Sequence, residues 1–139
     1  MSAVFPNASC VAIDGRGVLI EGIPGSGKSS LALALIDRGA VLVGDDGVTL
    51  ERRSEILWAS APPNTAGKLE IRNVGLVEMP VTEAPVALVV RLEDAAPRFI
   101  DHADEAGLEG LTLPLVRLWP HSAVIALRAE WALKLYGLS

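Results

Sequence analysis

Apolar residues in this chain occur in short runs that are punctuated by glycine, proline and charged residues. Runs this short, bounded by turn-forming residues, are typical of strands rather than helices. We predict strands at residues 10–14, 17–21, 40–44, 48–52, 55–59, 68–72, 87–90 and 111–116, the last broken by Pro114. Residues 15–16 and 53–54 would close hairpins, and residues 62–67 are the clearest loop in the chain.

Two segments follow the helical period instead. Residues 29–38 predict a helix that ends at Gly39, and residues 122–136 predict a closing helix that ends at Gly137. The apolar side chains of the closing helix fall near one face, which predicts that this face packs in the core. These residues are Val124, Ile125, Leu127, Trp131 and Leu135. The chain is unusually apolar for a small domain, so we also expect part of this helix, or residues 115–120, to contact a neighbouring subunit. Residues 93–110 are polar and are predicted to be irregular or weakly helical.

Only one strand–helix–strand unit stands out in this pattern, and the remainder is rich in strands. The sequence therefore predicts an α/β fold with a mixed sheet and few helices, not a regular doubly wound sheet. At 139 residues the chain is long enough for one domain, which we place at residues 1–139.

Composition narrows the classes of function. The chain has no apolar run of about 18 residues and no basic, apolar leader, so we expect no membrane span and no signal peptide. Its only cysteine, Cys10, cannot form an internal disulfide, which favours a reducing, cytoplasmic setting. A net charge of −5 argues against a general nucleic-acid binder.

The most specific motif is Gly22-Ile-Pro-Gly-Ser-Gly-Lys28-Ser29. A glycine, four residues and then Gly-Lys-Ser, placed between a strand and a helix, is the phosphate-binding P-loop pattern. Its backbone N–H groups would face phosphates, with the Lys28 ammonium at the β- and γ-phosphates and the Ser29 hydroxyl on Mg²⁺. The sequence thus predicts a nucleoside triphosphate site. Its binding residues would be Gly22, Ile23, Pro24, Gly25, Ser26, Gly27, Lys28, Ser29 and Ser30.

Asp45 and Asp46 follow the predicted strand at residues 40–44. The acidic residue that ends the second core strand of a P-loop protein usually contacts Mg²⁺ or orients the nucleophile. Adjacent carboxylates after a strand point to opposite sides, so one can face the phosphates while the other faces a hydrogen-bond network.

The chain resembles the catalytic domain of the HPr kinase/phosphorylase family. The resemblance rests on residues 17–39, on Val43-Gly-Asp-Asp46 and on a second motif, Leu69-Glu-Ile-Arg-Asn-Val-Gly-Leu-Val77, which is similar to that family's signature. It covers essentially the whole chain and is closest in form to short, single-domain members. It implies a P-loop NTPase-type fold akin to phosphoenolpyruvate carboxykinase, often assembled as a hexamer.

The resemblance also implies an activity. Members use ATP and Mg²⁺ to phosphorylate a serine of the phosphocarrier protein HPr, and many reverse this with inorganic phosphate, releasing pyrophosphate. Carried over by motif, Asp46 would be the base with Asp45 as its close support, although the order within the pair could be reversed. Glu70 would be a metal ligand with Ser29. Arg72 would be the signature arginine and Arg98 a further catalytic arginine.

The chain departs from the family pattern at two functional places. Asn7 stands where the family usually carries a histidine that handles phosphate, and asparagine cannot take a proton at neutral pH. The late loop tied to dephosphorylation retains only Arg117 as a possible phosphate contact. These departures leave a non-catalytic nucleotide-sensing module open as an alternative. A small-molecule P-loop kinase, which would use the same triphosphate site, is the other alternative.

Overall fold

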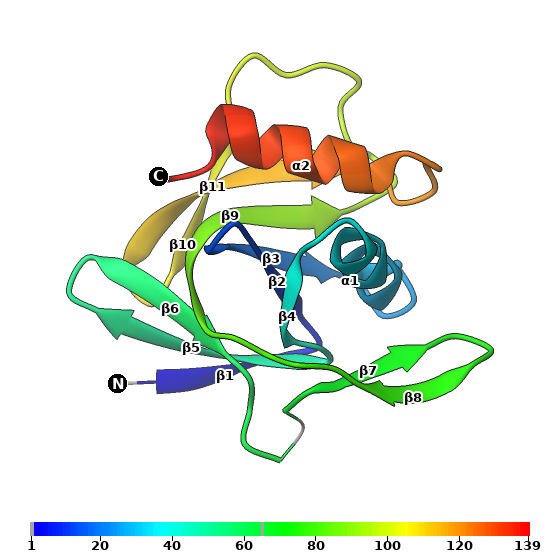
Figure 1. The fold of residues 1–139 in the computed structure, drawn as a ribbon. Helices are drawn as coiled ribbons and strands as arrows, with labels where there is room; N and C mark the ends of the chain where they lie inside the picture. Colours follow the sequence, from blue (N-terminus) through cyan, green and yellow to red (C-terminus); the bar gives the residue numbers. More distant parts are fainter. Residues whose placement is uncertain (1, 65) are drawn as a thin grey trace.

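The computed structural model describes residues 2–64 and 66–139, so Thr65, in the predicted loop at 62–67, lies outside the described residues. The described chain folds into a curled, mixed sheet with two helices and a separate two-stranded hairpin (Figure 1). The helices are α1 (Lys28–Asp37) and α2 (Ile125–Tyr136). The strands are β1 (Ser2–Pro6), β2 (Ser9–Ile13), β3 (Arg16–Gly22), β4 (Val41–Gly44), β5 (Gly47–Arg53), β6 (Ile56–Ser60), β7 (Lys68–Ile71), β8 (Gly75–Glu78), β9 (Ala84–Leu92), β10 (Asp104–Leu108) and β11 (Leu111–Leu118).

The main sheet runs in the order β1-β5-β6-β9-β3-β2-β4. Off this path, β11 also pairs with β9, and β10 pairs with β11. Strands β3, β9 and β11 are parallel, whereas β2 is antiparallel to both β3 and β4. Hence β3 and β4 run in the same direction with β2 between them, and α1 makes the crossover. The mixed α/β class predicted from the sequence is confirmed.

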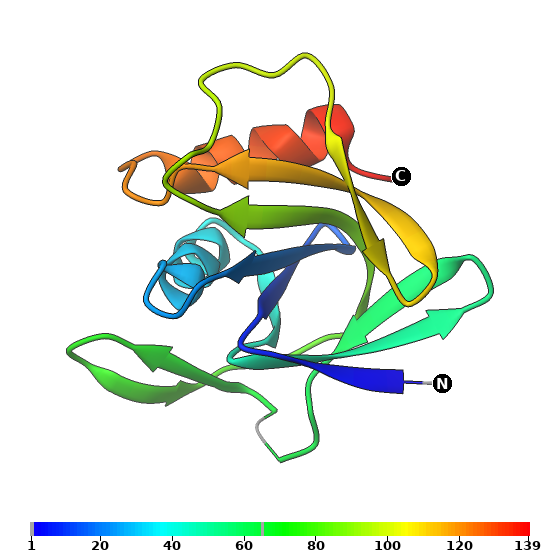
Figure 2. The same cartoon turned by 180° about the vertical axis from the view of Figure 1, so that it is seen from behind.

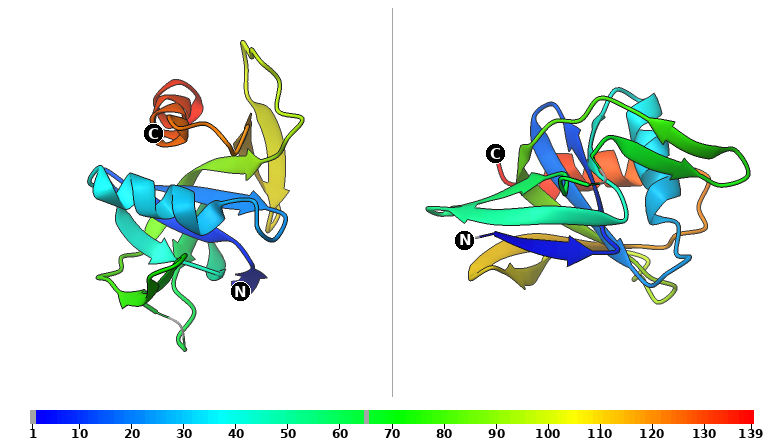
Figure 3. Two further views of the ribbon diagram at one scale, coloured as in Figure 1. Left: turned by 90° about the vertical axis from the view of Figure 1, so that its right-hand side faces the viewer. Right: turned by 90° about the horizontal axis from the view of Figure 1, so that it is seen from below.

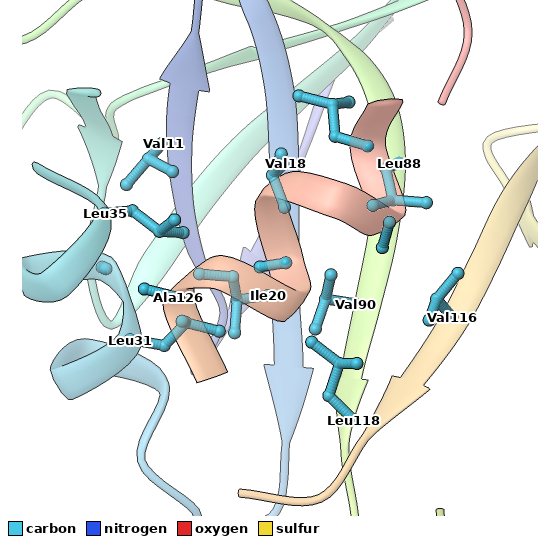
Figure 4. Close-up of a cluster of buried hydrophobic side chains, with 14 of the residues drawn as sticks. Val11, Val18, Ile20, Leu31, Leu35, Leu88, Val90, Val116, Leu118 and Ala126 are labelled. Atoms are coloured by element: carbon cyan, nitrogen blue, oxygen red, sulfur yellow. The ribbon is translucent and has the colours of Figure 1, made fainter. Parts of the chain in front are cut away.

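Alternation along the central strands divides the core into two clusters. Val18 and Ile20 of β3 face the helices, while Leu19 between them faces the opposite side. The first cluster joins both helices to β2, β3, β9 and β11 (Figure 4). The second joins the opposite face of those strands to the β5–β6 hairpin. Figures 2 and 3 show the two helices on one side of the sheet and that hairpin on the other. Burying both faces explains why these strands appear as nearly continuous apolar runs.

Cys10 belongs to the second cluster and is fully buried. Burial raises the pKa of its thiol to about 12, because the thiolate would lose its hydration. The cysteine is therefore an apolar core residue with no nucleophilic character at neutral pH.

Three expectations from the sequence need correction. Residues 104–108 are neither irregular nor helical but form β10, which turns into β11 at Glu109 and Gly110. Both turn residues have positive φ, 49° and 79°, as a tight hairpin with a type I′ turn requires. Pro114 does not break β11, because it lies opposite Glu105, and pairing with β9 begins only at Leu115.

The third correction concerns the closing helix, which begins at Ile125 instead of residue 122. Its buried face consists of Ala126, Ala129, Ala132 and Leu133. The bulky face predicted to lie in the core is exposed instead, with Trp131 at 57% and Leu135 at 66%. Alanine side chains are small, so this face of the helix can approach the sheet closely. The amphipathic pattern alone did not indicate whether the alanine face or the bulky face would pack against the sheet. Elsewhere the predicted strands and the first helix are confirmed to within a few residues, while β1 and β8 were not predicted.

Candidate active site

The glycine-rich loop, defined here as residues 22–27, connects β3 to the first turn of α1. Two of its glycines, Gly25 and Gly27, have φ of 80° and 104°, a left-handed conformation that costs glycine little. Gly27 caps α1, and its carbonyl accepts the Leu31 N–H at 2.9 Å. The loop therefore ends at the N-terminus of a helix, where free N–H groups favour an anion.

The Lys28 side chain folds back and contacts the loop backbone. Its ammonium donates to the carbonyl oxygens of Gly22 at 2.8 Å and Ile23 at 3.0 Å. These are neutral acceptors, and a phosphate oxygen would be a stronger, charged one. The ammonium is therefore positioned over the loop and can turn from the carbonyls to a bound phosphate.

Opposite the loop stands the aspartate pair. Asp45, only 7% exposed, accepts hydrogen bonds at Oδ1 from the hydroxyls of Ser9 at 2.6 Å and Ser29 at 2.7 Å. Asp46 is exposed and has a φ of 55°, which turns the chain into β5. The turn is anchored because the Gly47 N–H donates to the Ala8 carbonyl at 2.9 Å. The two neighbours thus differ: Asp45 belongs to a buried network, and Asp46 faces solvent.

The β7–β8 hairpin supplies a third wall. It stands apart from the main sheet, and β7 contacts α1 (Figure 3). Leu69 is fully buried, whereas its neighbour Glu70 is exposed, as alternation along a strand dictates. The predicted signature motif spans this hairpin, and the turn places Asn73 at a φ of 70°. Asparagine enters that conformation more readily than most residues, so the turn accommodates Asn73 at modest cost.

These elements enclose one polar pocket of about 250 Å³. Most of the residues expected from the sequence line it, together with Asn7 from the β1–β2 turn. The lining consists of Asn7, Pro24, Gly25, Gly27, Lys28, Ser29, Ser30, Asp46, Glu70 and Arg72. Of the remaining expected residues, Asp45 lies behind Ser29, and Gly22, Ile23 and Ser26 form the loop itself.

Arg98 is not among the residues that the fold brings to this pocket. It is exposed in the segment after β9 and lines a separate cavity with Trp131 and Tyr136 of α2. Arg98 was assigned from the position of its loop along the chain. In the structure, that loop lies beside α2. Within this chain, the arginine in the pocket is Arg72.

Sequence reasoning did not single out Ser9. A serine at the start of an otherwise apolar strand is the available signal, because a buried hydroxyl needs a hydrogen-bond partner. Glu21 and Arg91 form a second pair that was not predicted. Their side chains meet at 2.7 Å where β3 and β9 run parallel, directly before the glycine-rich loop.

Gly22 gives a prediction about the loop. A Cβ at this position would lie 2.5 Å from the Ser26 hydroxyl and 3.2 Å from the Leu92 carbonyl oxygen. Gly22→Ala should therefore displace the loop, cost about 1–3 kcal/mol of stability, and weaken phosphate or nucleotide binding. Thermal unfolding and titration with ATP would measure both effects.

Gly107→Ala is the matched control for that variant. Gly107 lies in β10, and no atom falls within 4 Å of an added Cβ. If both variants bind and unfold alike, then Gly22 does not set the shape of the loop.

A mixed, curled sheet with a glycine-rich loop beside a carboxylate-lined pocket defines this chain as an α/β protein with a preformed polar site at a helix N-terminus. Residues 3–109 match the family model of the HPr serine kinase C-terminal domain, and the chain belongs to that family.

Individual relatives agree with this assignment. The chain is 36% identical over 119 residues to the HPr kinase/phosphorylase of Clostridium novyi (strain NT), an alignment covering 78% of this chain and 39% of the relative. It is 40% identical over 91 residues to that of Clostridium acetobutylicum, covering 60% of this chain and 30% of the relative. The chain therefore spans well under half the length of these curated relatives.

A solved structure extends the likeness across the fold. The Hpr(Ser) kinase/phosphatase of Coxiella burnetii superposes with a TM-score of 0.83 at 28% sequence identity. The match covers 95% of this chain and 88% of that chain. In the described residues, no helix is long and apolar enough to cross a membrane.

Proposed function

We propose that this chain is the catalytic domain of an ATP- and Mg²⁺-dependent kinase that phosphorylates a serine of an HPr-type phosphocarrier protein. Residues 1–139 would act as one catalytic domain of the P-loop NTPase type, with a core like that of phosphoenolpyruvate carboxykinase. The observation that carries the proposal is that Asp46, Glu70 and Arg72 line the same pocket as Lys28 and Ser29. Three separate segments thus meet at one pocket: the start of α1, the turn between β4 and β5, and the β7–β8 hairpin.

The charges of the pocket suit phosphoryl transfer. This reaction is accelerated mainly by positioning and by neutralising phosphate charge. Lys28, Arg72 and the N–H groups at the start of α1 would hold the phosphates. Asp46 would orient the serine hydroxyl and take its proton as the serine oxygen bonds to the γ-phosphorus and the bond to ADP breaks.

The oxygen atoms of the site fit Mg²⁺. Ser29 and Glu70 offer oxygen ligands, the type that this ion prefers. Within the described residues, no group of three or more His, Cys, Asp or Glu could hold a metal by itself. That agrees with an ion held by one or two side chains together with phosphates and water. When bound, Mg²⁺ would neutralise charge on the phosphate oxygens.

Asn7 bears on the reverse reaction. It lines the pocket at a φ of 63°, a conformation in which both asparagine and histidine are enriched. Histidine would therefore fit the same turn without rebuilding it. In phosphorolysis, an oxygen of inorganic phosphate would attack the phosphoserine phosphorus in this pocket. The bond to the serine oxygen would break, that oxygen would take a proton, and pyrophosphate and serine would be released. Asn7 offers an amide there but no group that titrates near neutral pH.

A homo-oligomer, such as the hexamer expected from the resemblance, is part of the proposal. The bulky face of α2 and the nearby Trp119, 45% exposed, leave apolar side chains in solvent. Large exposed apolar patches often mark contact surfaces, which supports self-association at this face.

The function is tested by incubating the protein with γ-labelled ATP, Mg²⁺ and an HPr-type carrier from the same organism. We expect acid-stable, serine-linked label on the carrier. Adding inorganic phosphate afterwards should release pyrophosphate if the reverse reaction operates. The Asn7→His variant should show whether the reverse reaction depends on a titrating group. If both the wild-type protein and the Asn7→His variant bind ATP tightly without transferring phosphate, the chain is a nucleotide-sensing module and not a kinase.

A further inference from the structure

The glycine-rich loop follows β3, and the aspartate pair follows β4, but these strands are not neighbours because β2 lies between them. Strand β2 runs in the opposite direction, so its first residue, Ser9, lies at the edge where the other two strands end. Ser9 pairs with Ile20 of β3, and Cys10 pairs with Gly44 of β4.

Ser9 is 1% exposed, in a strand whose other residues belong to the core. A hydroxyl in such a place destabilises the fold unless it finds a partner. The partner is the Asp45 carboxylate, at 2.6 Å, and Asp45 is itself buried.

Ser9 and Ser29 both donate to Oδ1 of Asp45, at 2.6 and 2.7 Å. Neither bond uses Oδ2. The Ser29 hydroxyl proton is thereby directed at Asp45, which turns the oxygen's lone pairs away from the carboxylate. With Ser9 missing, only one bond would fix the rotation of the carboxylate.

We propose that Ser9 is a positioning residue: it fixes the Asp45 carboxylate so that Asp45 holds the Ser29 hydroxyl ready for a divalent cation bound with nucleotide. This inference rests on the proposed function and assigns a role to a residue outside the P-loop and signature motifs. Ser9 acts only through Asp45 and Ser29 and does not itself line the phosphate pocket.

The test separates cation-dependent binding from general damage. ATP affinity of Ser9→Ala is measured by calorimetry over a Mg²⁺ titration and again in EDTA, with thermal unfolding alongside. One charge-assisted hydrogen bond is lost, so we expect about a tenfold rise in the Mg²⁺ concentration needed for half-maximal tightening of ATP binding. Affinity in EDTA should stay within about twofold, since the loop itself is intact.

Two further variants sharpen the result. Ser9→Thr keeps the hydroxyl and should recover most of the Mg²⁺ dependence. Thr49→Val is the matched control, because the Thr49 hydroxyl is also buried but has no hydrogen-bond partner among the described residues. It should leave the Mg²⁺ titration unchanged.

A double-mutant cycle with Asp45→Asn tests whether Ser9 acts through Asp45. Adding Ser9→Ala to Asp45→Asn should cause little further loss, whereas independent effects would multiply. Wild-type Mg²⁺ dependence in Ser9→Ala, or equal losses with Mg²⁺ and in EDTA, would overturn the positioning role while leaving the kinase proposal intact. Absence of ATP binding by the wild-type protein would overturn both.

Discussion

Replacing Lys28 by alanine should reduce phosphoryl transfer at least about 10²–10³-fold, since removing one preorganised charge from a phosphate site typically has an effect of this size. In the structure the ammonium is held over the loop by the carbonyls of Gly22 and Ile23. The glycine-rich loop itself contains no charged residue, so it offers no substitute for the ammonium. Steady-state transfer to the carrier and direct titration with Mg²⁺-ATP would measure the loss.

Lys134→Ala is the control for this prediction. Lys134 lies near the end of α2 over the Trp131 ring and does not line the phosphate pocket. Its loss removes the same charge from the molecule at another site. If Lys28→Ala transfers phosphate as fast as Lys134→Ala does, the loop is not the phosphate site and the proposed function fails.

Most residues that line the pocket could be predicted from the sequence because they belong to local motifs. The glycine-rich loop, the aspartate pair and the β7–β8 motif are each continuous in the chain. Local turn geometry explains their residue types: Gly25, Gly27 and Asp46 all have positive φ. Such positions restrict the choice of amino acid strongly, so they remain visible in a single sequence.

Contacts between distant segments could not be predicted in the same way. Ser9 and Asp45 are 36 positions apart, and neither strand pattern indicates that the two side chains meet. Arg98 lies away from the pocket for a related reason: the segment after β9 contacts α2, where the Tyr136 hydroxyl donates to the Ile100 carbonyl, and the local sequence does not indicate this contact. Strands β1 and β8 carry mostly exposed side chains, so their hydrophobic pattern gave little signal.

The closing helix shows how a correct element can still be oriented wrongly. Its bulky residues and its alanines form different stripes, and amphipathicity favoured the bulky one. In the fold, the alanine stripe packs against the sheet because small side chains permit close approach. The result leaves Trp131 and Leu135 exposed, which is the basis for proposing self-association at that face.

The second large effect is expected from Asp46→Asn. If Asp46 takes the serine proton, transfer should fall about 10²–10⁴-fold, the usual contribution of a general base. Nucleotide affinity should change little, since Asp46 is exposed and forms no part of the Ser9–Asp45–Ser29 network. Asparagine suits the φ of 55° as well as aspartate does, so the turn into β5 should persist. Transfer kinetics and ATP titration would separate the two effects.

Asp14→Asn provides the control, because Asp14 is also exposed, has a φ of 50°, and turns β2 into β3 at the opposite end of that strand from Ser9. It should transfer phosphate at the wild-type rate. Asp45→Asn should behave differently from Asp46→Asn: it weakens the bonds from Ser9 and Ser29, so Mg²⁺-dependent ATP binding should suffer first. Should Asp46→Asn remain active while Asp45→Asn binds nucleotide normally and loses transfer, the two aspartates have exchanged roles, and the buried residue is the base.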